Sequence, residues 1–198
     1  MDYEELYRGK PPWEIGGPQP AIAAVLGEAR GPKVLDIGCG SGDLAIALAR
    51  LGHRVTGVDI SATAIEQARA KAAGLDVHFE VQDAARLRLT NGPFDSIFDS
   101  GLLHWLARYD SGVDDYLALL PGLAAPGATV FVLAVFEAAG GGSWGVSEEL
   151  LRDGFAAPDW TGTAIEETEA FADVDGQVIR HRAFLLRTSR TLGSVRTR

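Results

Sequence analysis

The chain has 198 residues, a formal net charge of −9 and 46% hydrophobic residues, which suits one domain with a substantial core. The acidic balance argues against nucleic acid as the main partner, because phosphate binding favours a basic surface. No apolar run approaches the ~18 residues of a membrane span, the acidic N-terminus is unlike a signal peptide, and Cys39 is the single cysteine. We therefore expect a soluble cytoplasmic protein that binds neither membrane nor nucleic acid.

Prolines and glycines interrupt residues 1–20 and exclude a long helix there. Three aromatic residues, Tyr3, Tyr7 and Trp13, stand between these breakers, which is more apolar surface than an unattached tail would carry. Two interpretations stay open. The segment is either an arm that docks on the domain through its rings, or a lid over a bound ligand whose cationic groups an aromatic face would attract.

Strand and helix patterns alternate in the next part of the chain. Helical spacing of apolar residues is found over residues 20–26, 44–49 and 61–73, and strand patterns over residues 34–36, 54–59, 77–81 and 94–98. Ser61 is a suitable N-cap for the third of these helices, and Ser147 could open a later helix with an acid-rich first turn. His78 lies in an alternating strand, which indicates a residue that faces solvent. The alternation of strands with helices predicts an α/β fold.

Further along the chain, the pattern predicts a helix over residues 113–124, a strand over residues 129–136 and a glycine-rich loop over residues 138–145. A helix that begins at residue 147 and two strands, over residues 163–171 and 178–187, follow. The strand over residues 129–136 is apolar throughout and suits a central strand that is covered on both faces. We expect one domain in which residues 21–137 bind the cofactor, residues 138–187 form the acceptor side, and residues 188–198 form a flexible tail.

Glycines at positions 38, 40 and 42 form a turn between the first predicted strand and its helix. Strand, glycine turn and helix are the layout of a nucleotide-binding crossover. A dinucleotide fingerprint requires glycine at position 43, but this chain has Asp43, whose charge would repel a diphosphate. Together with Asp36 and Asp59, this acid suits a ligand with cationic groups and a ribose, such as S-adenosylmethionine (SAM), better than NAD.

Residues 35–42, with the sequence Leu-Asp-Ile-Gly-Cys-Gly-Ser-Gly, resemble motif I of the class I SAM-dependent methyltransferases. Asp59, residues 82–84 and residues 94–101 resemble three further motifs of this family, and they follow in the family's order. The resemblance covers residues 33–101. It implies a Rossmann-like, doubly wound sheet of seven mostly parallel strands, in which the last strand is antiparallel, with an N-terminal lid segment.

The resemblance also implies a set of cofactor contacts, and SAM would be the cofactor and S-adenosylhomocysteine the product. The methionyl part would lie against Gly38, Gly40, Gly42 and Ser100, the ribose against Asp59 with Ile60 beside it, and the adenine against Asp83 and Ala84. Asp36 would either orient the glycine turn or meet the ammonium group. The sequence shows no metal-ligand spacing, and we expect no metal.

Residues 7–20 resemble the entry segment of one methyltransferase subgroup, which includes thiopurine, thiol and halide methyltransferases and bacterial heterocycle-methylating relatives. In that subgroup a tryptophan-containing segment folds over the cofactor. The resemblance therefore gives Trp13 a cofactor-binding role and favours the lid interpretation of this segment. We place Tyr7, which belongs to the same segment, among the residues that bind the methyl acceptor.

The methyl acceptor would enter beside the loop that follows the fourth predicted strand, because loops at the carboxyl ends of strands face the ligand crevice. His104 and Trp105 are in this loop. His104 is either a general base, since its usual pKa is near neutrality, or a histidine that lines the following helix. Trp105 and Trp144 are candidate walls of the acceptor pocket, although Trp105 could equally be core and Trp144 part of a surface linker.

The sequence thus predicts an enzyme that transfers a methyl group from SAM to a sulfur, nitrogen or oxygen atom of a small, aromatic or heterocyclic molecule. It would act as a monomer or homodimer. Three alternatives stay open: a thiol or halide methyltransferase, a SAM-binding protein without activity, and an NAD-linked oxidoreductase, which the acid at position 43 disfavours.

Overall fold

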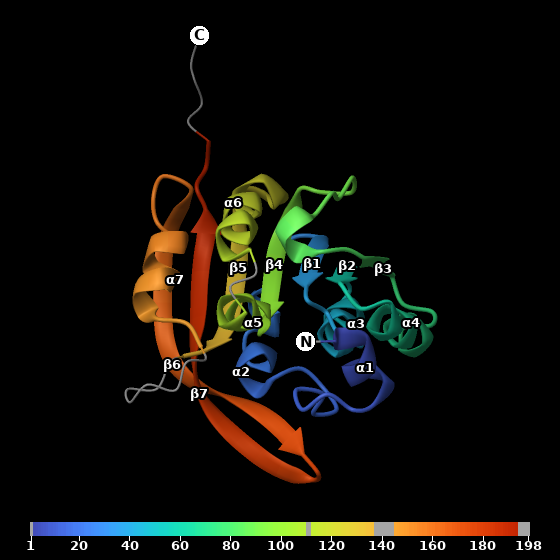
Figure 1. Ribbon diagram of the computed structural model, residues 1–198. Helices are drawn as coiled ribbons and strands as arrows, with labels where there is room; N and C mark the ends of the chain where they lie inside the picture. The colour runs from blue at the N-terminus through green and yellow to red at the C-terminus, as the bar shows by residue number, and fades with distance from the viewer. Residues whose placement is uncertain (1, 110–111, 137–144, 194–198) are drawn as a thin grey trace.

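In the computed structural model, which describes residues 2–109, 112–136 and 145–193, seven strands form one sheet in the order β3-β2-β1-β4-β5-β7-β6 (Figure 1). The strands are β1 Lys33–Ile37, β2 Arg54–Asp59, β3 Val77–Val81, β4 Phe94–Ser100, β5 Ala124–Val135, β6 Trp160–Val174 and β7 Gln177–Arg190. The α-helices are α1 Tyr3–Arg8, α2 Pro20–Ala23, α3 Asp43–Arg50, α4 Ala62–Lys71, α5 Leu102–Arg108, α6 Val113–Leu123 and α7 Glu148–Gly154. Two short 3-10 helices, η1 Leu26–Glu28 and η2 Ala84–Arg86, complete the described elements.

The first five strands are parallel, whereas β7 pairs antiparallel with both β5 and β6. The expected mostly parallel sheet of seven strands, with an antiparallel last strand, is therefore confirmed. Strand β1 lies between β2 and β4, so the strand order changes direction there. Ligands of open α/β sheets bind at such a switch point, outside the carboxyl ends of the strands.

Apolar residues cover both faces of the sheet, as β5 illustrates. Phe131 and Leu133 belong to a core cluster shared with α2, α3 and α4, whereas Val130 and Val132 belong to a second cluster shared with α5, α6 and α7. Successive side chains of a strand point to opposite faces. The uninterrupted apolar run in this strand therefore reflects burial on both sides.

Local capping signals in the sequence are confirmed. The Ser61 hydroxyl accepts the N–H of Ala64 (3.1 Å) at the start of α4, and the Ser147 hydroxyl accepts the N–H of Leu150 (3.0 Å) at the start of α7. Strand β3 has the expected bounds, and the His78 side chain is 65% exposed. None of the helices in the described part of the chain has both the length and the apolar character that a membrane span requires.

The C-terminal hairpin is longer than the sequence suggested. Strand β6 begins at Trp160, and β7 continues beyond Arg187 to Arg190. Thr188, which we assigned to the flexible tail, is buried and lies opposite Val130 of β5. Pairing with the central strand extends β7 here, and this long-range contact leaves no trace in the local composition.

The N-terminal arm, residues 2–19, crosses the molecule from α4 to the β6–β7 hairpin. At one end the Glu4 carboxylate accepts the N–H groups of Ala62 (2.6 Å) and Thr63 (3.1 Å), which start α4. At the other end the Gln19 side chain exchanges two hydrogen bonds with the Phe171 backbone, at 2.9 and 2.8 Å. Both ends of the arm are thus attached to the domain.

Candidate functional site

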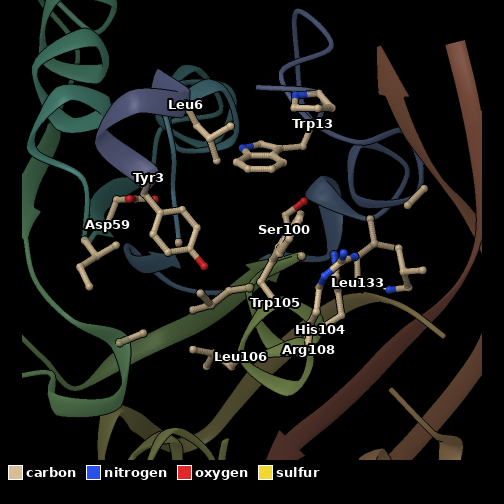
Figure 2. A pocket seen from close by; sticks show the side chains of 18 of the residues that line it. Tyr3, Leu6, Trp13, Asp59, Ser100, His104, Trp105, Leu106, Arg108 and Leu133 are labelled. Atoms are coloured by element: carbon tan, nitrogen blue, oxygen red, sulfur yellow. Dashed lines mark hydrogen bonds between the residues drawn. The ribbon is translucent and has the colours of Figure 1, made fainter. Parts of the chain in front are cut away.

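The carboxyl ends of β1, β2 and β4 and the N-terminal arm surround a cavity of about 800 Å³ (Figure 2). This volume is typical of ligand-binding pockets. We call one part the acidic end, which is lined by Gly38, Asp59, Ile60, Asp83 and Ala84. We call the other part the aromatic end, which is lined by Trp13, His104, Trp105, Leu106 and Leu133. Ser100 also lines the cavity.

The glycine turn between β1 and α3 has the backbone conformation that the sequence indicated. Gly38, Gly40 and Gly42 have φ angles of 72°, 54° and 87°, a region that favours glycine. Gly38 lines the cavity. A Cβ atom on Gly40 would lie 2.7 Å from the Tyr7 hydroxyl, and one on Gly42 would lie 2.9 Å from Ala68 Cβ. The last two glycines therefore allow close packing of the arm and of α4.

Asp59 fixes the geometry of the acidic end. Its carboxylate accepts the N–H of Gly40 (2.9 Å) from the glycine turn and the N–H of Ser61 (2.9 Å) from the start of α4. Burial raises the pKa of Asp59, while these N–H groups oppose the shift. A carboxylate has about four lone-pair sites, so this side chain can still accept bonds from the hydroxyl groups of a ligand.

Asp36 does not line the cavity in the described residues; it is buried below the turn, 1% exposed, with a backbone bond to Ala45. Of our two expectations for this residue, the position suits orientation of the turn rather than contact with the ammonium group. Burial, together with the carboxylates of Asp59 and Asp99, raises the pKa of Asp36 to about 8. Its Oδ2 atom has no hydrogen-bond partner among the described residues, which suits a protonated carboxyl.

The arm is fastened to the glycine turn between its two ends. The Glu14 carboxylate accepts the N–H of Ser41 (3.2 Å) and also the Ser41 hydroxyl. The Lys71 ammonium of α4 donates to the same hydroxyl (2.7 Å) and to Asp43 (2.6 Å). Asp43, whose charge disfavoured a diphosphate ligand in the sequence analysis, thus lies at the start of α3 and forms an ion pair with Lys71 of α4. Nothing in the sequence pattern marked Glu14 as part of this contact.

Aromatic rings from the arm and from α5 meet above the cavity (Figure 2). Trp13 and Trp105 pack edge to face with ring centroids 5.1 Å apart, and the Trp13 indole donates to the Tyr7 hydroxyl (2.9 Å). The Tyr7 hydroxyl also lies over Gly40. Tyr7, which we expected to bind the acceptor, lines the cavity; its ring is buried, and its hydroxyl lies close to the glycine turn. Trp144, the other expected wall, lies outside the described residues.

His104 lies at the aromatic end and is 7% exposed. Its Nδ1 atom accepts the N–H of Val135 (3.3 Å), which leaves the proton of the neutral ring on Nε2. Burial, together with the neighbouring charges of His181 and Arg108, lowers the pKa of His104 to about 3. The geometry therefore disfavours the general-base interpretation, because a ring with this pKa retains little proton affinity at neutral pH.

The β6–β7 hairpin belongs largely to the segment that we expected on the acceptor side, and it contributes a wall whose residues the sequence analysis did not single out. Ala170, Ala172, Val174, Ile179 and His181 line the cavity from this side. Their spacing of two is visible in the sequence as an ordinary strand pattern. Only the fold shows that this strand face closes the pocket. Arg108 and Tyr3 also line the cavity and were not anticipated. No group of three potential metal-ligating side chains is found in the part of the chain that the structure describes.

Comparisons with known proteins agree with this site. Residues 34–120 match the family described as "Methyltransferase domain". Over 192 residues the chain is 36% identical to the 2-heptyl-1-hydroxyquinolin-4(1H)-one methyltransferase of Mycobacteroides abscessus, and the alignment covers 88% of this chain and 82% of that protein. The chain also resembles a solved structure with a TM-score of 0.84 and 33% identity, over 98% of this chain and 92% of that one. That structure is described as concerning the conversion of a disulfide bond into a thioacetal group during echinomycin biosynthesis.

The fold and the site define a class I methyltransferase, and the chain belongs to this SAM-dependent family of enzymes. The 1,6-didemethyltoxoflavin-N1-methyltransferase of Burkholderia thailandensis, solved with 1,6-didemethyltoxoflavin and S-adenosylhomocysteine bound, has the same fold. The TM-score is 0.64 and the identity 24%, over 86% of this chain and 75% of that one. S-adenosylmethionine is the cofactor. The acidic end fits the ribose of this molecule, since Asp59 retains capacity to accept hydrogen bonds from hydroxyl groups.

Proposed function

We propose that this enzyme methylates a sulfur, nitrogen or oxygen atom of a small, planar aromatic or heterocyclic molecule. The observation that carries the proposal is the continuity of the cavity, which joins the acidic end to an aromatic end under one closed arm. The cofactor supplies an activated methyl group. The protein then has to bind both molecules, align them and exclude water, and alignment alone is worth about 7–11 kcal/mol in well-oriented reactions.

We assign the acidic end to the cofactor. Asp59 would accept hydrogen bonds from the ribose, Ile60 and Ala84 would pack beside the adenine, and Asp83 would face its amine. Asp83 Oδ1 accepts the N–H of Ala85 (3.0 Å), which holds this carboxylate at the edge of the cavity. Gly38 and Ser100 border the cavity between these residues and the aromatic end, where the methionyl part would lie.

The aromatic end would hold the acceptor against Trp13 and Trp105, whose rings contact each other edge to face and would together give a flat ring an apolar wall. The Arg108 guanidinium lies 5.5 Å from the Trp105 ring centroid, so a positive charge stands beside this wall. His104 would act as a neutral, positioning side chain and not as a base. Acceptors that reach the site already deprotonated, or that need no deprotonation, would then be favoured.

The relatives support a small-molecule acceptor without fixing its atom. One is named for a heptyl-bearing hydroxyquinolinone, and one of lower identity is named for the N1 atom of a toxoflavin precursor. A third is described for a reaction at a disulfide. Among these acceptors, we favour a ring compound with an acidic hydroxyl group, because the neutral His104 and the nearby Arg108 suit an anion.

The test is formation of S-adenosylhomocysteine with a panel of acceptors: a small thiol, iodide, a thiopurine, 1-hydroxyquinolin-4(1H)-ones and a simple phenol. We expect turnover with the ring compounds. Turnover with thiol or iodide alone would support the thiol or halide alternative instead. Tight SAM binding measured by calorimetry, without turnover of any acceptor, would support a SAM-binding protein without activity and would contradict the proposal.

A further inference from the structure

We propose that the inner face of the β6–β7 hairpin binds an alkyl chain carried by the acceptor. This inference rests on the proposed function, because it assigns the chain to the ring compound that the aromatic end would hold. The face consists of Ala170, Ala172, Val174 and Ile179, with His181 at its inner end. We call these five residues the hairpin groove.

The hairpin extends past the central sheet. Strand β5 pairs with β7 from Ser189 to Ala183, whereas β6 and β7 stay paired as far as Val174 and Gln177 (Figure 1). The overhang lies at the carboxyl end of β5, beside the cavity. Its other edge is attached to the arm, since the Asp173 N–H donates to the Pro12 carbonyl (2.7 Å) and Lys10 pairs with the Asp173 carboxylate (2.5 Å).

Strand register places the groove residues on one face. Ala170 lies opposite His181, and Ala172 lies opposite Ile179. Side chains two residues apart along a strand, and side chains directly opposite across a pair, share a face of the sheet. The opposite face carries Val178, which is 67% exposed and does not line the cavity.

Side-chain size and exposure along the groove suit an extended apolar chain. The two alanines leave space in the middle of the wall, and exposure rises from 9% at Ala170 to 39% at Val174 and 40% at Ile179. The groove therefore starts deep in the cavity and opens to solvent at the hairpin tip. The distance from residue 170 to residue 174 is about 13 Å at the rise of a strand, enough for several methylene groups.

Two observations select an alkyl chain as the occupant. The groove is continuous with the cavity that would hold the acceptor ring, so a substituent on that ring reaches it without leaving the protein. The groove side chains between the His181 end and the tip are aliphatic, so they can bind a ligand only by burying apolar surface. A second copy of the chain, which could instead cover Val174 and Ile179, is an outcome that the test below separates.

The first experiment uses 1-hydroxyquinolin-4(1H)-ones with methyl, pentyl, heptyl or nonyl chains at the carbon beside the ring nitrogen. Binding is measured by calorimetry with S-adenosylhomocysteine present, and methyl transfer is measured separately. We expect affinity and kcat/KM to rise about fourfold for each added methylene until the chain passes the hairpin tip. Affinity that does not change from methyl to nonyl would overturn the inference, whether or not methyl transfer occurs.

The second experiment compares three hairpin variants. Ala172→Phe fills the groove with a residue that strands tolerate well, and Ile179→Asp places a charge in it. Val178→Asp is the matched control, because it puts the same charge on the same strand but on the opposite face. We expect the two groove variants to lose about tenfold or more in affinity for the nonyl compound, as when roughly two methylenes lose contact, with the methyl compound unaffected.

The outcomes separate this inference from the proposed function. Chain-length-dependent binding without methyl transfer would support the groove and contradict the proposed acceptor. Methyl transfer that is independent of chain length would support the proposed function and overturn the groove. Loss of affinity for methyl and nonyl compounds alike in Ala172→Phe would also overturn it. If Ile179→Asp converts a dimer into a monomer in sedimentation and leaves nonyl affinity unchanged, the face is a self-association surface and the inference is wrong.

Discussion

Replacing Asp59 by asparagine tests the assignment of the cofactor end most directly. The carboxylate accepts N–H groups from Gly40 and Ser61, both at 2.9 Å, and it lines the cavity. Asparagine keeps the shape but loses the charge, and its NH₂ group cannot accept a bond. Hydrogen bonds to charged groups are worth about 1.5–3 kcal/mol. The SAM dissociation constant should therefore rise about 10- to 150-fold.

Calorimetric titration of SAM at pH 7.5 provides the measurement. The matched control is Asp83→Asn, because Asp83 lines the same end but its side chain is 43% exposed and its charge is better solvated. The control should weaken binding by less than about tenfold, since exposed charges contribute up to about 1 kcal/mol. A folded Asp59→Asn variant with unchanged SAM affinity would refute the assignment, as would equal losses in the two variants.

Three further predictions follow from the geometry of the site. His104→Asn keeps an acceptor for the Val135 N–H. It should lower kcat/KM by less than about tenfold and leave the shape of its pH profile unchanged, whereas loss of a general base would lower the rate about 10²- to 10⁴-fold. A hundredfold loss together with a lost limb in the pH profile would restore the base role.

The folded protein should become less stable as pH rises from 7 to 8. The unfolded Asp36 carboxyl ionises near pH 4, but the folded one holds its proton up to about 8, so folded molecules bind more protons in this window. The expected loss between pH 7 and pH 8 is about 1 kcal/mol, because the full slope of about 1.4 kcal/mol per pH unit falls as the folded carboxyl itself begins to ionise; the loss is visible as a lower unfolding temperature at pH 8 than at pH 7. Asp36→Asn should lack this drop, and an equal drop in the variant would contradict the pKa of Asp36. Glu14→Gln should loosen the arm from Ser41, so that trypsin cleaves faster after Arg8, which is followed by Gly9, and the KM for SAM rises; unchanged cleavage would contradict the role of Glu14 as an attachment.

The sequence alone determined the features that depend on local physics. The glycine turn was predictable because positive φ angles favour glycine, and the starts of α4 and α7 because Ser61 and Ser147 can cap a helix. The parallel sheet followed from the alternation of strand and helix patterns. The order of the acids Asp36 and Asp59 around the turn indicated the cofactor, and the family resemblance extended that indication to the remaining contacts.

Tertiary structure decided which side chains share a space and which charge states that space permits. The sequence gives no reason to expect an unusual pKa for His104, but burial and the contact with Val135 make it a weak base. Asp36 sits in motif I, yet the fold places it below the turn and away from the cavity. Ala172 and Ile179 look like residues of any strand, and only the pairing of β6 with β7 beyond β5 turns them into a wall. Desolvation and long-range pairing are properties of the assembled domain, so no local pattern could have revealed them.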